Sequence, residues 1–242
     1  MLRSIDSLSG YTLLATDGEV GKVQGFFFDD TRWNIRYLVV ETGGWMHSRK
    51  VLIAPAALEQ PDWEGKEFPT NLTREQVQSS PDIDVDKPVS RQQQVQLQQH
   101  YEWPGYVYPT FPPYPPPVRV SEEEKAPADE EEGDPHLRST QEVIGYHIQA
   151  TDGEIGHVED FLADDEVWII RYMVVDTRNW LPGKNVLIAP EWIRDLKWAE
   201  RDVFVDLSRE AVKESPEFDP SSPVDREYEE LLYTHYSRPK YW

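Results

Sequence analysis

The sequence predicts a mainly β protein made of two small β-barrels in tandem, each followed by short C-terminal helices. An internal repeat carries this prediction: a shift of 135 positions aligns residues 10–106 with 145–241 without a gap, at about two fifths identity. Each copy contains short runs of β-branched and aromatic residues separated by turn residues, which favours a small barrel over βαβ units. We expect a first domain at 1–106, a linker at 107–136 and a second domain at 137–242.

Each copy opens with a predicted hairpin. The stretch Ala-Thr-Asp-Gly-Glu-Val-Gly at 15–21 recurs at 150–156 with isoleucine in place of valine. Asp-Gly between two strand-like runs is a strong hairpin signal, because glycine accepts a positive φ, and a glycine inside the return strand indicates a bend or bulge. We interpret the repeated residues of this motif as structural: Asp17, Gly18, Gly21, Asp152, Gly153 and Gly156.

The best strand of each copy is the run WNIRYLVVET at 33–42, repeated as WIIRYMVVDT at 168–177. Arg36 and Arg171 are isolated cations in these apolar runs. We favour a structural pairing of each arginine with a turn aspartate over a binding role. Val-Leu-Ile-Ala-Pro, at 51–55 and again at 186–190, predicts another strand that ends at proline.

Short helices are expected at the end of each copy. Thr73 and Ser208 are suited to cap a first helix, and Gln76 permits a capping box in the first copy only. Ser90 and Asp225 are candidate caps of a second helix that runs to about residue 100 or 235.

Between the copies lies a segment rich in proline and aromatic residues, followed by an acidic run. This composition indicates an extended, solvated linker, and we give less weight to a role as a ligand for a proline-recognition domain. The formal net charge of the chain is −21, and the run at 121–134 carries only −7 of it, so the folded surfaces are themselves acidic. Such a surface opposes nucleic-acid binding.

The sequence has no cysteine, no signal-peptide pattern and no apolar run of membrane-spanning length. We expect a cytoplasmic protein with no direct membrane insertion, in which peripheral association through a partner is possible. The relative arrangement of the two barrels, docked as a pseudo-dimer or separated, is left open, as is the oligomeric state.

The Gly-Tyr start, the Asp-Gly-Glu-x-Gly hairpin, the Trp-x-Ile-Arg-Tyr-x-Val-Val strand and Val-Leu-Ile-Ala-Pro together resemble the PRC-barrel. This small β-barrel occurs in the cytoplasmic part of the photosynthetic reaction-centre H subunit and in the C-terminal half of the ribosome maturation factor RimM. The likeness covers residues 10 to about 72 and 145 to about 207. It implies binding to protein or RNA rather than catalysis, and function lives in sites grafted onto folds. In H subunits a transmembrane helix normally precedes this barrel, and because the sequence has no apolar run of that length we do not expect such an anchor here.

No motif in the sequence indicates an enzyme. There is no nucleophile elbow, no phosphate-binding loop and no thiol. The aspartates at 17, 29 and 30 and their copies lack the ligand spacing of an EF-hand, so we favour a turn role over a calcium site. The six histidines form no two-ligand spacing. We therefore expect no catalytic site, no cofactor and no metal.

Three tryptophans recur between the copies, and such residues build cores or anchor interfaces. The loops where the copies differ are the most plausible partner-binding positions, because loops on a rigid scaffold carry function. The candidates are Met46, His47, Arg49, Leu181 and Lys184. The leading hypothesis is a protein-binding adaptor or scaffold. The alternatives are a reaction-centre component that supports light-driven electron and proton transfer and a RimM-like ribosome assembly factor; a hydrolase or metalloenzyme comes last.

Overall fold

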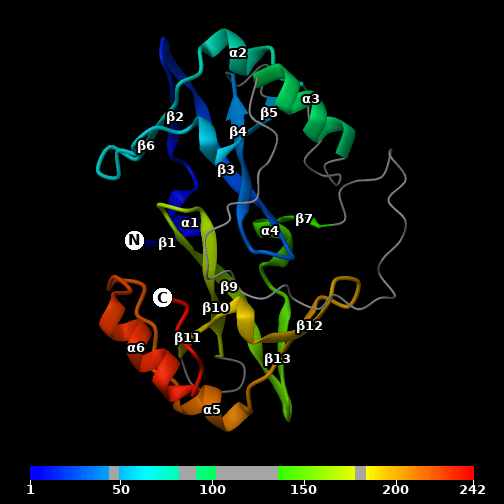
Figure 1. The fold of residues 1–242 in the computed structure, drawn as a ribbon, viewed down its shortest axis with the longest axis vertical. Coiled ribbons are helices and arrows are strands. Elements are labelled where there is room, and N and C mark those ends of the chain that lie inside the picture. Colours follow the sequence, from blue (N-terminus) through cyan, green and yellow to red (C-terminus); the bar gives the residue numbers. More distant parts are fainter. Residues whose placement is uncertain (44–48, 82–90, 102–135, 178–183) are drawn as a thin grey trace.

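The computed structural model describes residues 1–43, 49–81, 91–101, 136–177 and 184–242. The described strands form two sheets, one beyond the other along the long axis of the molecule (Figure 1). In that view the helices that follow each sheet lie toward opposite ends of the molecule. They are α2 (Arg74–Gln78) and α3 (Arg91–Tyr101) for the first repeat, and α5 (Arg209–Glu214) and α6 (Arg226–His235) for the second.

The sheet of the first repeat has the strand order β5-β4-β3-β2-β6. Its pairings are antiparallel except that of β2 with β6, which is parallel. The elements are β2 (Thr12–Ala15), β3 (Gly18–Asp29), β4 (Ile35–Thr42), β5 (Arg49–Ile53), the 3-10 turn η1 (Pro55–Ala57) and β6 (Glu67–Pro69).

The sheet of the second repeat has the order β11-β10-β9-β8-β13-β12, again with one parallel pair, β8 with β13. Its edge strand β12 has no counterpart strand in the described part of the first repeat, where isolated bridges occur instead. The elements are β8 (His147–Ala150), β9 (Gly153–Asp164), β10 (Ile169–Asp176), β11 (Asn185–Ile188), η3 (Pro190–Trp192), β12 (Ile193–Lys197) and β13 (Asp202–Val205).

The two repeats exchange their first strands. Strand β1 (Leu2–Ser4), followed by the short helix α1 (Ile5–Leu8), pairs with β9 of the second repeat. Strand β7 (Leu137–Ser139), followed by α4 (Thr140–Val143), pairs with β3 of the first repeat. Each sheet is therefore completed by a strand that precedes the other repeat in the chain.

One hydrophobic core spans both repeats. Phe28 of β3 lies 6.0 Å from Phe161 of β9 between ring centres, and Phe161 also packs 6.3 Å from Trp33. On the other side of the junction, Phe26 and Phe68 lie 6.3 and 5.9 Å from Trp168. Burying aromatic surface across a junction in this way stabilises the two halves as a unit.

The prediction of a mainly β protein is confirmed. Neither strand path closes into a barrel among the described residues. The helices expected after each sheet are present, with a complete Thr73–Gln76 capping box at α2 and Asp225 as the cap of α6. Ser90 and residues 107–135 of the predicted linker lie outside the described residues, while His136 is described and contacts Asp30.

Candidate functional site

Arg3 of β1 bridges the two repeats. Its Nε donates to the Asp165 carboxylate at 2.7 Å, and its guanidinium carbon lies 3.6 Å from the centre of the Trp63 ring. The charge-assisted bond therefore reaches the second repeat while the cation–π contact stays with the first.

Arg138 of β7 makes the equivalent contacts in the opposite direction, from the second repeat to the first. Its Nε lies 3.4 Å from Asp30, and its guanidinium carbon lies 4.1 Å from the centre of the Trp198 ring. His136 Nδ1 adds a 3.0 Å contact with Asp30. Burial raises the pKa of the Asp30 carboxyl, and the neighbouring His136 and Arg138 offset part of that effect.

The paired aspartates of the β3–β4 and β9–β10 turns have separate roles. The first of each pair closes its turn: Asp29 Oδ1 accepts from Thr31 N, and Asp164 Oδ1 accepts from Glu166 N, both at 3.0 Å. The second of each pair receives the exchanged arginine. The duplicated acidic turns thus position the junction.

The tryptophans that follow these turns have left-handed backbones. Trp33 has φ 60° and Trp168 has φ 55°, a conformation that costs a bulky residue on the order of 1–3 kcal/mol. It turns each carbonyl toward the other repeat, where Trp168 O accepts from Ile35 N and Trp33 O from Ile170 N, both at 2.7 Å. Backbone strain is therefore held by bonds across the junction.

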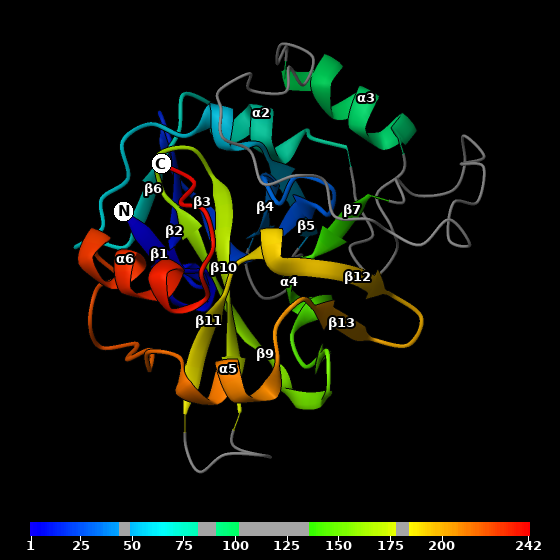
Figure 2. The ribbon, with the colours of Figure 1, turned by 60° about the horizontal axis from the view of Figure 1, so that its bottom comes forward.

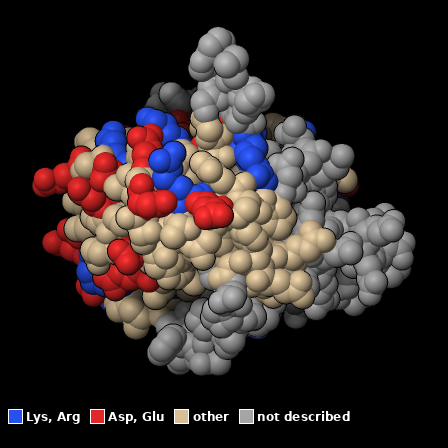
Figure 3. Space-filling view, turned by 90° about the horizontal axis from the view of Figure 1, so that it is seen from above, with Lys and Arg blue, Asp and Glu red and all other residues tan. Residues whose placement is uncertain are grey.

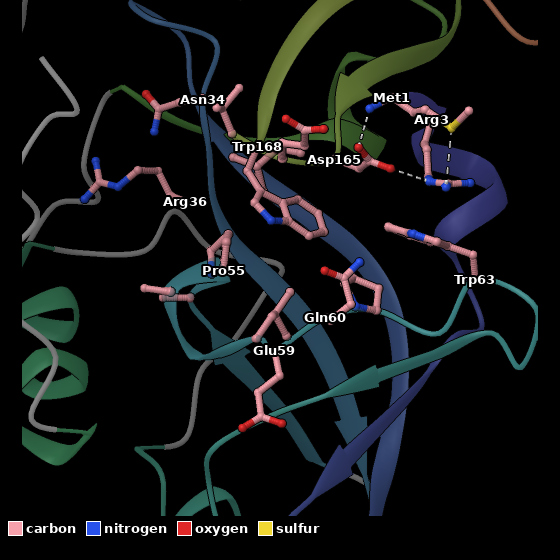
Figure 4. A pocket seen from close by; sticks show the side chains of 17 residues that line it. Met1, Arg3, Asn34, Arg36, Pro55, Glu59, Gln60, Trp63, Asp165 and Trp168 are labelled. Atoms are coloured by element: carbon pink, nitrogen blue, oxygen red, sulfur yellow. Dashed lines mark hydrogen bonds and ion pairs between the residues drawn. The ribbon is translucent and has the colours of Figure 1, made fainter. Parts of the chain in front are cut away.

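A hollow of about 1070 Å³ opens beside Trp168, between the repeats. Figure 4 shows Trp168 projecting into this space, with Gln60 nearby and Trp63 on the far side under Arg3. Proline and aliphatic side chains supply the apolar walls, and Val167 is 49% exposed there. The lining residues are Met1, Arg3, 34–36, 54–56, 58–61, Trp63 and 165–168.

The charges of the hollow are unevenly paired. Its three cations are bound to carboxylates: the Met1 ammonium and Arg3 share Asp165, and Arg36 lies 3.5 Å from Asp29. Glu59 and Glu166 are exposed, and their carboxylates form no hydrogen bond or ion pair with described residues. With Asp29 included, three cations face four carboxylates, so the surplus is a single negative charge, and the two carboxylates left unpaired are Glu59 and Glu166. Elsewhere, acidic side chains gather on one side of the end of the molecule seen in Figure 3, with a few basic ones among them.

The same wall of the second repeat is closed. Ile170, Arg171, Ala189, Pro190 and Glu191 correspond by the repeat to residues 35, 36, 54, 55 and 56, yet the space beside them is about 10 Å³. Tyr233 of α6 and Tyr241 fill it, with the Arg171 guanidinium carbon 4.3 Å from the centre of the Tyr241 ring. Figures 1 and 2 both place α6 alongside β10 and β11.

Buried polar groups hold this covering segment. Glu229 is 4% exposed and accepts from the hydroxyls of Tyr172 at 2.8 Å and Tyr241 at 2.7 Å. Tyr233 donates to Glu191 at 2.8 Å. Burial raises the pKa of Glu191 and of all three tyrosines, so the phenols remain donors at neutral pH.

The predicted hairpin residues lie away from the hollow. Asp17 Oδ1 accepts from the backbone N of Arg74 at 2.7 Å, and Asp152 Oδ1 does the same for Arg209, so each turn caps a helix. Gly18 and Gly153 have φ 132° and 138°. At Gly21 and Gly156 a Cβ would lie 2.0 Å from a carbonyl oxygen of the next strand, which explains the repeated glycine.

Arg36 and Arg171 each reach the first aspartate of their own turn. Arg36 lies 3.5 Å from Asp29, and Arg171 lies 3.8 Å from Asp164. Arg36 also donates to Gln94 of α3 at 3.2 Å. Arg36 thus links the central strand, the acidic turn and α3, whereas Arg171 links its strand and turn to Tyr241 after α6.

Of the predicted partner-binding residues, Met46, His47 and Leu181 lie outside the described residues. Arg49 donates to the carbonyls of Gln78 and Ser80, and Lys184 to those of Lys213 and Ser215. These two side chains fasten the ends of α2 and α5 to the sheets. The structure therefore brings none of the described candidates to the hollow.

The described residues contain no cluster of three or more His, Asp or Glu side chains suited to holding a metal ion. No helix in this part of the chain is long and apolar enough to cross a membrane. No protein-family model matches the sequence, and no curated protein matches it.

Sequence reasoning missed the exchanged strands and the hollow. The signal for the strands was available, because Leu2-Arg3-Ser4 recurs as Leu137-Arg138-Ser139 at the same offset of 135 positions. Extending the repeat to these residues identifies an arginine at the same position of each copy, but it does not show that each arginine pairs with the other copy.

Proposed function

We propose that this chain is a non-catalytic protein-binding adaptor built from two units similar to PRC-barrels. The observation that supports it is the hollow at the junction. Two partly exposed tryptophans, apolar walls and unpaired acids there fit the anatomy of a protein-recognition site, in which aromatic anchors dominate the binding energy.

Recovery of bound proteins by the tagged full-length chain tests this proposal. The chain is expressed in its own cells, membranes are solubilised gently, and the bound proteins and pigments are identified. Val167→Arg puts a bulky positive charge on the apolar wall of the hollow, and Trp242→Ala is the control at an exposed aromatic of the second repeat.

We expect a partner that binds the wild-type chain and Trp242→Ala but is lost with Val167→Arg. Reaction-centre subunits with pigment would instead support a component of light-driven electron and proton transfer, and ribosomal proteins would support a RimM-like factor. If no protein is retained specifically, the adaptor proposal is wrong.

A further inference from the structure

We propose that the hollow at the junction binds a basic, apolar peptide segment of a partner protein, with an arginine or lysine side chain laid against Trp168. This inference rests on the proposed adaptor function and names the chemistry of its partner. The volume of about 1070 Å³ lies at the upper end for a ligand pocket.

The unpaired charges at the hollow favour a basic ligand. The Met1 ammonium, Arg3 and Arg36 at the hollow already have carboxylate partners. Glu59 and Glu166 have none among the described side chains. A basic side chain would complement these acids and be steered by the net charge of −21.

The indole of Trp168 gives the hollow an aromatic wall. Trp168 is partly exposed, while its repeat counterpart Trp33 is 0% exposed. Trp168 packs against Phe26 and Phe68 and still lines the hollow, so its position is fixed before a ligand arrives. A fixed indole is the best aromatic partner for a guanidinium or an ammonium.

Within the molecule, arginine side chains are already bound by a tryptophan ring together with a carboxylate. Arg3 lies on Trp63 and binds Asp165, and Arg138 lies on Trp198 and contacts Asp30. At the C-terminal segment, the Arg226 guanidinium carbon lies 4.2 Å from the Trp242 ring centre and its Nη1 3.0 Å from Glu229. Trp168 and Glu166, which both line the hollow, offer an indole and a carboxylate without an arginine.

The apolar walls of the hollow favour a peptide with apolar side chains next to its basic residue. Pro55, Leu58, Pro61 and Val167 line the hollow, and contact with them contributes the hydrophobic share of the affinity. Such a peptide differs from an acidic one in charge and from a purely polar one in apolar content. The proposal can therefore be tested by peptide composition.

The test is selection of a displayed library of random 12-residue peptides on the immobilised full-length chain, followed by fluorescence anisotropy with labelled individual peptides. We expect enriched peptides to carry arginine or lysine next to leucine, isoleucine, methionine or proline. The double variant Glu59→Arg with Glu166→Arg should weaken their binding at least tenfold. The matched control, Glu210→Arg with Glu227→Arg at exposed positions of α5 and α6, should leave it unchanged.

Enrichment of acidic or neutral peptides, affinity equal in the double variant, or no enrichment over a chain-free control would each overturn the proposal. Peptides that bind the double variant as tightly as the wild-type chain would leave the adaptor function standing at another surface. Self-association of the chain that the double variant abolishes would mean that a second copy occupies the hollow, and would equally overturn the peptide proposal. The protein-recovery experiment decides the adaptor function separately.

Discussion

The two repeats share their strands and turns but treat one surface differently. In the second repeat, Tyr233 and Tyr241 pack onto the wall formed by β10 and η3 and leave a space of about 10 Å³. In the first repeat, the corresponding wall borders a hollow of about 1070 Å³. In the second repeat the C-terminal segment therefore fills this surface. In the described part of the first repeat, α3 reaches it through the Gln94–Arg36 hydrogen bond, and the hollow lies beside that contact. The strands and turns that the repeats share are those needed for folding, whereas the surface on which they differ is the candidate binding site.

The largest expected effect concerns the two tryptophans after the acidic turns. Trp33→Ala should destabilise the chain by about 3–5 kcal/mol, because Trp33 is fully buried between Phe28 and Phe161. Trp168→Ala should cost about half as much, because part of its ring is already exposed. Urea unfolding at neutral pH measures both. Equal losses would show that Trp168 is a core residue and would weaken the account of the hollow.

The next effect compares the polar contacts of the two covering helices. Glu229→Ala should cost about 2–3 kcal/mol, because it leaves the hydroxyls of Tyr172 and Tyr241 buried without their acceptor. The matched change in the first repeat, Gln94→Ala, should cost about 1 kcal/mol, since it removes a neutral acceptor from Arg36. The same unfolding series reports both values. A larger loss for Gln94→Ala would reverse the assignment of the tighter covering segment to the second repeat.

The exchanged arginines provide a comparison in which the repeats should agree. Arg3→Ala and Arg138→Ala should each cost about 1 kcal/mol, a modest value because both side chains are partly exposed. Their effects should add in the double variant, because the two clamps share no partner. A loss confined to one of the two variants would mean that the pseudo-symmetric junction is held from one side only.

The smallest expected effect is a pH dependence specific to the second repeat. Burial raises the folded-state pKa of Glu191 above its ordinary value of 4.5, so the folded chain binds this proton more tightly than the unfolded chain. Stability from this group therefore falls as pH rises from about 4.5 through the raised folded pKa. Glu191→Gln should flatten that decline in stability. The first-repeat counterpart, Ala56, has no titratable group and contributes no such pH dependence. Urea midpoints between pH 4 and 8 check this, and identical slopes would contradict it.

Much of the fold could be predicted because it depends on local chemistry. The Asp-Gly hairpins, the aromatic and β-branched central strands and the Thr73 and Asp225 caps all follow from neighbouring residues. The exchange of β1 and β7 could not be predicted, because the same three residues can pair with either repeat and only tertiary packing selects one. The hollow was equally hidden, since Trp33 and Trp168 occupy equivalent positions in the repeat and their different exposure depends on tertiary packing.

The central claim is that the two repeats form a single folding unit through their exchanged strands. Equilibrium urea unfolding of the full chain, followed at once by far-UV circular dichroism and tryptophan fluorescence, tests it most directly when the wild type is compared with Leu137→Ala. Leu137 is 4% exposed and precedes the second repeat in the chain, yet it pairs with Asp29 of the first. The account predicts one coincident transition that the variant moves as a whole to lower urea. Two separate transitions, of which Leu137→Ala moves only the one belonging to the second repeat, would contradict it.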